Sequence, residues 1–324
     1  MQLFRIQLEL ISPISTPLRA DTLWGHIAWG IRYHDGETTL TEWLDQYDAD
    51  SPPLIISDPF PAGFIPRPHL VKKRNSQQID LAAYRERKEN KKRTWIPGKA
   101  WDLLATQLSH EKVTEALGQQ ADQPETPVTA GIMHAAINRL TGGTQQESGG
   151  TLFSDHCQFY SKSKTQFDVY AWSKADQTKT ASLFECGLIG GYGRNASSGA
   201  GHLRLSEINP CEFTIPTRAD ACMSLASVTP ALKDGKLLSG QLETRSGRLG
   251  GDFAIGPTPD GKVQRQKKPI TTFTTGSVFH YRSSSQWIGR VLRNIHPYAP
   301  IRHYAMAPVL PCHLMTHTTG GSKT

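Results

Sequence analysis

The sequence predicts an α+β protein with two ferredoxin-like halves, and three observations support this fold class. Helix-like and strand-like segments are interspersed along the chain without a regular β-α-β repeat. The 324 residues leave room for two halves of this kind, although no sequence repeat relates them. Residues 2–11 alternate apolar and polar side chains as a half-buried strand does, and residues 21–34 carry apolar side chains at helical spacing.

The other elements follow from local patterns. Asp21 or Thr22 is the expected N-cap of the first helix, Gly36 is its expected C-cap, and Trp24 and Trp29 are expected to pack in the core. Residues 58–68 contain too much proline for regular structure. Helices are expected at about 37–48, 98–108, 178–189 and 284–292, and strands at 54–57, 132–140, 151–160, 166–172, 202–208, 211–215, 222–228 and 273–281. A polar linker is expected at 110–130 and a long hairpin at 233–272.

These elements predict three regions. Residues 1–145 form an N-terminal ferredoxin-like domain with a basic insertion at about 70–95. Residues 146–315 form a C-terminal ferredoxin-like domain that carries a glycine-rich loop at 190–201. Residues 316–324 are polar and form a flexible tail.

The composition favours a polyanionic partner. The net charge of +7 and the pI of about 9.1 point to nucleic acid first and an anionic membrane surface second. No apolar run approaches the roughly 18 residues of a membrane-spanning helix, and the first residues alternate like a strand rather than a signal peptide. The five cysteines are scattered and form no CxxC pair, so reduced thiols in a cytoplasmic protein are expected.

The strongest local signal is the segment GGYGRNASSGAG at residues 190–201, with five glycines in twelve residues. A loop that packs closely against a phosphate backbone needs residues without bulky side chains. It also gains from exposed N–H groups, hydroxyl groups and a cation, and this segment contains all of them.

Several interpretations of this loop compete. A Walker A loop is excluded, because no Lys-Ser or Lys-Thr follows a suitable glycine. Residues 191–196 match the dinucleotide fingerprint GxGxxA, but they follow a helical pattern and precede a strand, the reverse of what that fingerprint requires. A loop that binds an RNA backbone and a glycine-rich turn without a ligand both remain open.

Two other segments carry donors or charge. Residues 134–142 place several hydrogen-bond donors beside a turn, which suits phosphate or sugar but is also ordinary for a strand end. The strongly basic stretch from Lys72 to Arg93 is either a solvated insertion or a basic finger that meets phosphates.

Taken together, these segments resemble the RAMP superfamily of CRISPR proteins. Residues 184–203, FECGLIGGYGRNASSGAGHL, look like its glycine-rich loop. The combination is similar to the fourth Csm subunit, in the Cas-five group. The further segments that carry this resemblance are TPLRADTLWGHIAWGIR at 16–32, FIPRP at 64–68, INRLTGGT at 137–144, GTLF at 150–153 and HPYAPIRHYAMAPVLP at 296–311.

The resemblance implies a subunit of a type III-A CRISPR (Csm) effector complex. Such a subunit caps the foot of the complex, binds the repeat-derived 5′ tag of the CRISPR RNA, and contacts the large polymerase-like subunit and the backbone RAMP subunit. Its fold has two RNA-recognition-motif-like halves and an inserted hairpin, the thumb, to which Lys72–Arg93 would belong. No cofactor and no membrane contact is implied.

The expected RNA-binding residues lie in the glycine-rich loop, beside the 134–142 turn and in basic segments. They are Arg19, Arg67, Lys72, Lys73, His134, Asn138, Arg139, Thr141, Gly190, Gly191, Tyr192, Gly193, Arg194, Asn195, Ser197, Ser198, Gly199 and Gly201. No metal site and no catalytic residue is expected, because the sequence has no HExxH motif, paired carboxylates or metal-ligand cluster.

Two other functions are weighed against a binding subunit. Some superfamily relatives cleave repeat RNA with a histidine, so a repeat-processing endoribonuclease is the main alternative, with His26, His69, His134 and His202 as its candidates. A packed or surface histidine is the better explanation of each. A nucleotide-binding enzyme that uses residues 191–196 is a further alternative.

Overall fold

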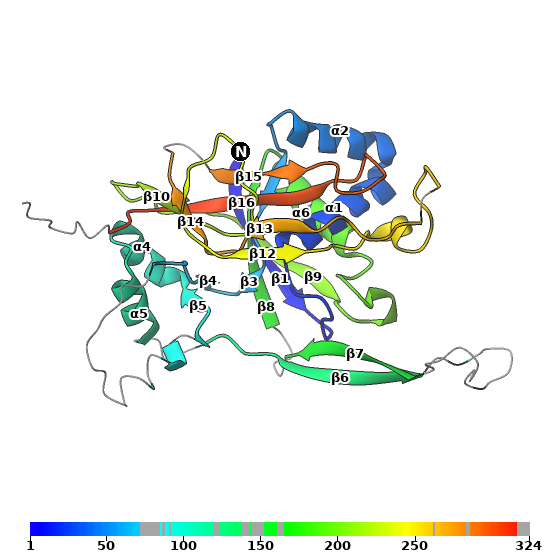
Figure 1. Ribbon diagram of the computed structural model, residues 1–324, viewed down its shortest axis with the longest axis horizontal. Coiled ribbons are helices and arrows are strands. Elements are labelled where there is room, and N and C mark those ends of the chain that lie inside the picture. The colour runs from blue at the N-terminus through cyan, green and yellow to red at the C-terminus, as the bar shows by residue number, and fades with distance from the viewer. Residues whose placement is uncertain are drawn as a thin grey trace, which may run out of the picture.

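The structure is a computed structural model, and it describes residues 1–71, 85, 88–90, 92–118, 123–135, 137, 143, 152–160, 165–261, 263–282 and 286–315. Two five-stranded antiparallel sheets form the body of the molecule, with helices beside them. A long hairpin runs along the bottom of Figure 1, apart from the body. Within these residues, no helix combines the length and the apolar character needed to cross a membrane.

The first sheet pairs strands that are far apart in the sequence. Its members are β1 (Gln2–Leu10), β2 (Leu54–Ile56), β3 (Phe60–Pro61), β8 (Thr165–Ser173) and β9 (Leu203–Pro210). Their order is β2-β8-β1-β9, and β3 follows β2 along the same edge of β8. This sheet therefore joins the two halves that the predicted boundary at 145/146 would separate, so that boundary is wrong.

Three helices accompany the first sheet. They are α1 (Ala20–Asp35), α2 (Glu37–Asp48) and α6 (Gln177–Leu188). Apart from α2, β3 and the long insertion that follows β3, the chain runs β1-α1-β2-β8-α6-β9, which is the β-α-β-β-α-β connectivity of ferredoxin-like folds. Alternate residues of β1 are fully buried, and the strand predicted at 2–11 and the helices predicted at 21–34, 37–48 and 178–189 are confirmed.

The second sheet is built from the last third of the chain. Its strands are β10 (Ala221–Ser224), β11 (Leu237–Ser239), β14 (Val278–His280), β15 (Trp287–Leu292) and β16 (His303–Cys312), in the order β11-β14-β10-β16-β15. In the described residues no α-helix lies between these strands, so the ferredoxin-like connectivity occurs in the first sheet only. A separate two-stranded ladder joins β12 (Leu242–Arg245) to β13 (Ile270–Phe273), with a short 3-10 turn, η2 (Gly251–Ala254), between them.

The two sheets share a hydrophobic core, because β16 contacts both α1 and β2. The buried Tyr304 shows the connection: its hydroxyl accepts the Ile56 N–H at 2.8 Å and donates to the Ile56 carbonyl at 2.9 Å. The ring of Trp24 stacks on Tyr304 with centroids 5.7 Å apart, as expected for a core tryptophan. Trp29 is only half-buried and packs against Phe253 on the outer side of α1.

An insertion of about a hundred residues separates β3 from β8. It contains β4 (Phe64–Pro66), β5 (Trp95–Pro97), α4 (Gly98–Thr106), α5 (His110–Gly118), β6 (Val128–Ala135) and β7 (Leu152–Phe159). Helices α4 and α5 cover the face of the second sheet that is turned away from the first core. Strands β6 and β7 pair with each other and form the hairpin outside the body (Figure 1).

Several local predictions are wrong, each because of tertiary packing. The expected linker at 110–130 contains α5, whose Val113 and Leu117 are buried, and the proline-rich stretch 58–68 contains the short strands β3 and β4. The helix expected at 284–292 is strand β15, and 211–215 is not a strand. Strand β16 has no predicted counterpart, although it is central in the second sheet.

The predicted caps of α1 are half right. Gly36 ends the helix with a φ of 91° while its N–H donates to the Arg32 carbonyl. The helix begins at Ala20, so Asp21 and Thr22 lie within its first turn and do not cap it. The carboxylate of Asp58, distant in sequence, accepts the Ala20 N–H at 2.8 Å in their place.

We expect Gly30→Ala to lower the free energy of unfolding by about 1–3 kcal/mol, because α1 and α6 touch at glycines. A Cβ on Gly30 would lie 2.7 Å from the Gly187 nitrogen. The matched control is Gly25→Ala in the same helix, where a Cβ meets nothing within 4 Å and should stabilise by about 0.5–1 kcal/mol. Urea denaturation measures both, and equal stability of the two variants would contradict the close contact.

Candidate nucleic-acid interface

The glycine-rich loop runs from the end of α6 to the start of β9 and reverses direction in tight turns. Every second residue from 191 to 195 has a positive φ: Gly191 at 78°, Gly193 at 75° and Asn195 at 64°. Gly199 and Gly201 follow with values of 92° and 68°. The loop lies at the surface, since Arg194, Ser197, Ser198 and Gly199 are all exposed.

Tyr192 anchors this loop to the start of α1. Its side chain is fully buried, and its hydroxyl donates to the Pro17 carbonyl and accepts the Arg19 N–H, both at 2.8 Å. Burial raises the pKa of the Tyr192 hydroxyl, which stays protonated. The side chain expected to contact RNA is thus an internal anchor, because its ring fills the space between the loop and α1.

Gly193 is pressed against two side chains from the N-terminal part of the protein. Its N–H donates to His26 Nε2 at 2.9 Å, and the next N–H, of Arg194, donates to Thr16 Oγ1 at 2.8 Å. A Cβ on Gly193 would lie 2.5 Å from Thr16 Cβ. Gly201 is equally confined, because its Cβ would overlap the Tyr192 carbonyl. These glycines are required by the protein's own packing.

The main-chain amides of the loop are mostly engaged within the protein. The N–H groups of residues 191–194 and 198–201 all donate to protein acceptors. Among the described atoms, the N–H groups of residues 195–197 have no such acceptor, and they form the tip of the loop. Fewer main-chain amides are therefore available to a ligand than the sequence suggested, and the exposed side chains make up more of the candidate binding surface.

Asp155 links the tip of the loop to the hairpin. Its carboxylate accepts a hydrogen bond from Asn195 Nδ2 at 2.9 Å and lies 3.1 Å from a guanidinium nitrogen of Arg194. Two residues closer to the body along β7, Cys157 Sγ lies 3.0 Å from Ser15 Oγ, and next to it Gln158 exchanges main-chain hydrogen bonds with Ile14. The glycine-rich loop and strand β7 therefore form one surface.

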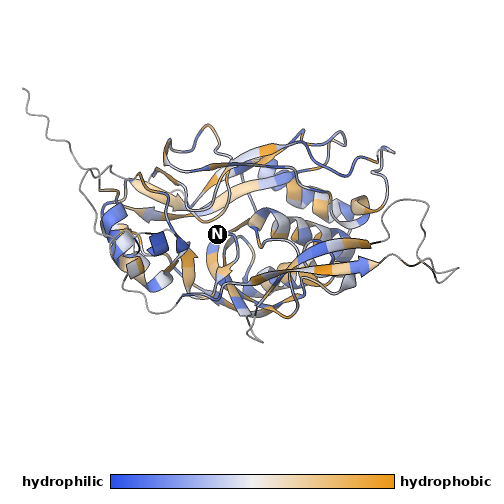
Figure 2. Ribbon diagram, turned by 60° about the horizontal axis from the view of Figure 1, so that its bottom comes forward, coloured by the Kyte–Doolittle hydropathy of each residue, from blue (hydrophilic) through white to orange (hydrophobic). Residues whose placement is uncertain are grey.

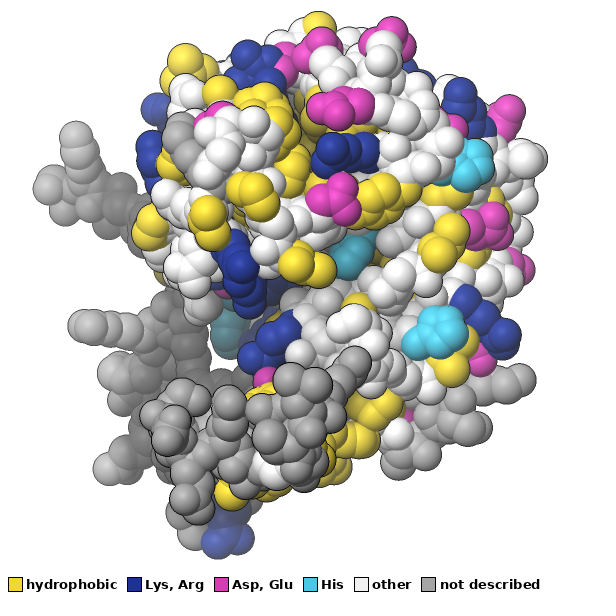
Figure 3. All heavy atoms as spheres, turned by 90° about the vertical axis from the view of Figure 1, so that its right-hand side faces the viewer, with side chains coloured by type: hydrophobic (Ala, Val, Ile, Leu, Met, Phe, Trp, Pro, Cys, Tyr) yellow, Lys and Arg dark blue, Asp and Glu magenta, His cyan; other side chains and the backbone are white. Residues whose placement is uncertain are grey.

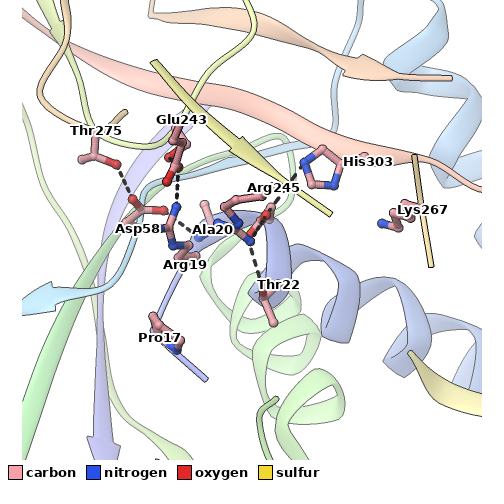
Figure 4. Close-up of polar contacts among 12 residues, drawn as sticks. Pro17, Arg19, Ala20, Thr22, Asp58, Glu243, Arg245, Lys267, Thr275 and His303 are labelled. Atoms are coloured by element: carbon pink, nitrogen blue, oxygen red, sulfur yellow. Dashed lines mark hydrogen bonds and ion pairs between the residues drawn. The ribbon is translucent and has the colours of Figure 1, made fainter. Parts of the chain in front are cut away.

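Arg19 lies in a polar cluster at the start of α1, shown in Figure 4, rather than on an open surface. Its guanidinium pairs with Glu243 of β12, and Glu243 also accepts from Ser227 at 2.9 Å. Beside it, Arg245 pairs with Asp21 at 2.8 Å. These pairs attach β12 to α1 and neutralise the arginine that the sequence assigned to RNA.

Burial shifts the pKa values of two groups in this cluster toward their neutral forms. It raises the pKa of Asp58 to about 6, although Thr275 and the Ala20 N–H donate to that carboxylate. It lowers the pKa of Lys267 to about 8. The cavity between these side chains has room for about one water molecule, so the cluster is a structural contact and not a ligand pocket.

The other predicted residues are spread over the molecule. Arg67 donates to the Asn90 carbonyl at 2.7 Å and is half-buried, away from the loop. His134 lies on β6, where its ring stacks on Phe153. Gly190 is exposed at the end of α6. Lys72, Lys73, Asn138, Arg139 and Thr141 lie outside the described residues.

The candidate histidines occupy four different settings. His26 accepts the Gly193 N–H, His69 lies 3.1 Å from Thr274 Oγ1, His134 stacks on the hairpin, and His202 is exposed beside the loop. In the part of the chain that the structure describes, no group of three or more His, Cys, Asp or Glu side chains is placed to hold a metal ion. All five cysteines carry free thiols.

Sequence reasoning missed Asp155 and Thr16 as parts of this site, and it singled out His26 only as a candidate for RNA cleavage. Asp155 lies in a tripeptide with no recognisable motif, and only the strand register places it opposite the loop. Thr16 lies within the segment 16–32 that carries the family resemblance, which is the one signal that could have singled it out. Figure 3 shows the resulting surface, with Lys and Arg side chains along the hollow between the body and the hairpin.

Comparison of sequences identifies no relative: no protein-family model matches the chain, and no curated protein matches it. Comparison of folds, in contrast, identifies similar solved structures. A Csm4 chain from the Csm1–Csm4 cassette in complex with cA4 matches with a TM-score of 0.56 and 13% identity, covering 97% of this chain and 99% of that one. The cassette with one ATP gives 0.55 and 15%, with the same coverage.

A third structure extends the likeness to another assembly. The Csm3–Csm4 subcomplex of the type III-A CRISPR-Cas interference complex matches with a TM-score of 0.51 and 13% identity, covering 97% of this chain and 100% of that one. The chain therefore has a Csm4-like fold over nearly its whole length.

Gly193→Ala should destabilise the protein by about 1–3 kcal/mol, since it combines a positive φ with the collision against Thr16. Gly190→Ala is the control within the same loop, because a Cβ there meets nothing within 4 Å. Thermal unfolding of both variants measures the difference. If Gly193→Ala is as stable as Gly190→Ala, the loop does not pack on Thr16 as described.

Acid should weaken the contact between His26 and the loop. Burial lowers the pKa of His26 to about 4 from an ordinary 6.5, and the neutral ring accepts the Gly193 N–H. Between these two values the unfolded chain binds a proton that the folded chain refuses, so the free energy of unfolding falls as the pH drops, by up to about 2 kcal/mol at pH 5.

The comparison protein for this pH effect is His26→Gln, whose amide oxygen accepts the same N–H and does not titrate. Denaturant unfolding at pH 7 and pH 5 should show a smaller loss in the variant than in the unaltered protein. Burial also lowers the pKa of His69 and His303, so the test is the difference between the two proteins. Identical losses would show that His26 is not the group responsible.

Proposed function

We propose that this protein is a non-catalytic RNA-binding subunit of a type III-A CRISPR (Csm) effector complex, and that it binds the 5′ repeat-derived tag of the CRISPR RNA. The observation that carries the proposal is the Csm4-like fold across 97% of the chain, with its glycine-rich loop open at the surface. The fold provides the framework, and the loop supplies the chemistry for a sugar-phosphate strand.

The exposed part of the loop suits a phosphate group. Arg194 supplies a guanidinium whose side chain is 54% exposed, and Ser197 and Ser198 supply hydroxyl donors. Beside them are the amides of residues 195–197, which donate to no acceptor among the described atoms. Asp155 holds the guanidinium from one side only, which leaves its other N–H groups for a second anion. A strand bound here would follow the line where the loop meets the hairpin.

The partners follow from the assemblies in which the matching folds occur. Those folds belong to Csm4 in complexes with Csm1 and with Csm3. We infer that this chain contacts a large polymerase-like subunit and a backbone RAMP subunit, at the foot of a complex of that kind. Exposed apolar side chains outside the hairpin, among them Leu103, Ile189 and Ile255, are suited to such contacts.

The hairpin β6–β7 is our candidate for the thumb. The sequence placed the thumb at Lys72–Arg93, most of which lies outside the described residues. Residues 128–159 instead contain a paired two-stranded ladder that lies apart from the body (Figure 1). Hydrophobic residues lie along it (Figure 2), and its exposed apolar side chains include Val128, Met133, Leu152 and Phe153.

A binding role fits the histidines better than catalysis. Strand cleavage needs a base beside the 2′-hydroxyl and a group that stabilises the phosphorane. His26 already uses Nε2 for the Gly193 N–H, and its lowered pKa makes it a weak base. The alternative, a repeat-processing endoribonuclease, predicts a discrete metal-independent cut when the protein is incubated with repeat RNA.

The decisive test is purification of the tagged protein from its own cells, followed by identification of the bound RNA and proteins. The proposal expects CRISPR RNAs that begin with the same repeat-derived tag, together with a polymerase-like subunit and a RAMP backbone subunit. Recovery of the protein without RNA, or with RNA unrelated to repeats, would overturn it.

Arg194→Ala should weaken binding of tag RNA about tenfold and reduce the slope of log K against log salt by about one, because one phosphate contact is lost. Lys233→Ala is the matched control: it removes the same charge from a similarly exposed side chain, which pairs with Asp50 just after α2. Fluorescence anisotropy over a series of salt concentrations measures both. Equal effects of the two changes would remove Arg194 from the site.

A further inference from the structure

The register of the hairpin places two cross-strand pairs of side chains on one of its faces. His134 pairs with Phe153 across the ladder, and Ile132 pairs with Asp155 two residues closer to the body. Because side chains alternate along a strand, Phe153 and Asp155 share a face, whereas Leu152 and Ser154 point to the other.

This face is the one that meets the glycine-rich loop. Asp155 holds Arg194 and Asn195, as described above, and Cys157 contacts Ser15 on the same face. Phe153 precedes Asp155 by two residues on β7, and it lies about 7 Å farther from the body along the strand. The aromatic pair therefore lies next to the Ile132–Asp155 pair on this face, and Asp155 is the residue that holds Arg194.

The rings of His134 and Phe153 form a flat platform. Their centroids are 5.2 Å apart and their planes are inclined by only 17°. His134 is half-buried, while Phe153 remains 50% exposed, so the platform presents the phenyl ring to solvent. An exposed aromatic ring beside a cation and hydroxyl groups is the arrangement by which single-stranded nucleic acids are held, with bases on rings and phosphates on cations.

We propose that Phe153, supported by His134, is a stacking platform for one unpaired base of the RNA strand whose phosphate lies on Arg194. This inference rests on the proposed function and narrows its ligand to single-stranded RNA. In a duplex, both faces of each internal base are already stacked, so none is available for the ring. A base is a better occupant than an apolar protein segment, because the neighbouring Arg194, Ser197 and Ser198 match a phosphate.

The test uses the full chain and a short single-stranded RNA that carries 2-aminopurine at one position at a time. Binding should quench the fluorophore at one position, because stacking on an aromatic ring quenches it. Phe153→Ala should abolish that quenching and weaken binding about tenfold, the low end of what one stacked base contributes. The salt slope should stay unchanged, since no phosphate contact is lost.

Leu152→Ala is the matched control, because Leu152 is the neighbouring residue, is 64% exposed, and points to the opposite face. It should leave both affinity and quenching within twofold of the unaltered protein. The same RNA annealed to its complement should bind more weakly and respond equally to both substitutions.

The outcomes separate this inference from the function on which it rests. If the unaltered protein binds no RNA and Arg194→Ala changes nothing, the proposed function fails. If RNA binds and Arg194→Ala weakens it, but Phe153→Ala matches Leu152→Ala, the platform alone is overturned. Loss of a co-purifying subunit in Phe153→Ala with unchanged RNA affinity would likewise overturn it, by showing that the ring contacts protein.

Discussion

The buried hydroxyl of Tyr192 is the contact on which the candidate site depends. It joins the glycine-rich loop to the Pro17 carbonyl and the Arg19 N–H, immediately before α1 begins. It fixes the loop where the Gly193 and Arg194 N–H groups reach His26 and Thr16, which places the tip with Arg194 beside Asp155. A tyrosine suits this role because its ring fills the gap while its hydroxyl both donates to and accepts from the main chain just before α1.

Because the loop is anchored in this way, its glycines serve packing within the protein more than contact with a ligand. Gly193 and Gly201 permit the loop to approach its own protein, at Thr16 and at the Tyr192 carbonyl, and most loop amides are consumed there. The part left for a ligand is the tip, where side chains rather than amides dominate. A similar redistribution affects charge: Arg19 and Arg245 are paired with Glu243 and Asp21 around the start of α1, so these two arginines already have anionic partners within the protein.

Topology explains how two distant segments come to form one surface. The first sheet is completed only when β8, α6 and β9 return after the long insertion, and the same return brings the glycine-rich loop to α1. The hairpin emerges from the end of that insertion, just before β8, so its base lies close to the loop. A carboxylate on the hairpin can therefore hold an arginine on the loop, although the two are about forty residues apart in sequence.

The sequence by itself determined the elements whose pattern is local. The alternation of β1, the helical spacing of α1 and α6, the stop at Gly36 and the exposed glycine-rich loop all follow from residues close together in the chain. Only the tertiary structure decided the rest. Strand β16 is buried on both faces, so it shows no alternation of apolar and polar residues. Its prolines also argue against a strand when the sequence is considered alone. Four contacts of the site join residues far apart in sequence: the cap of α1 from Asp58, the anchor at Tyr192, the pairing of Arg19 and the placement of Asp155. Spacing along a chain carries no information about such contacts.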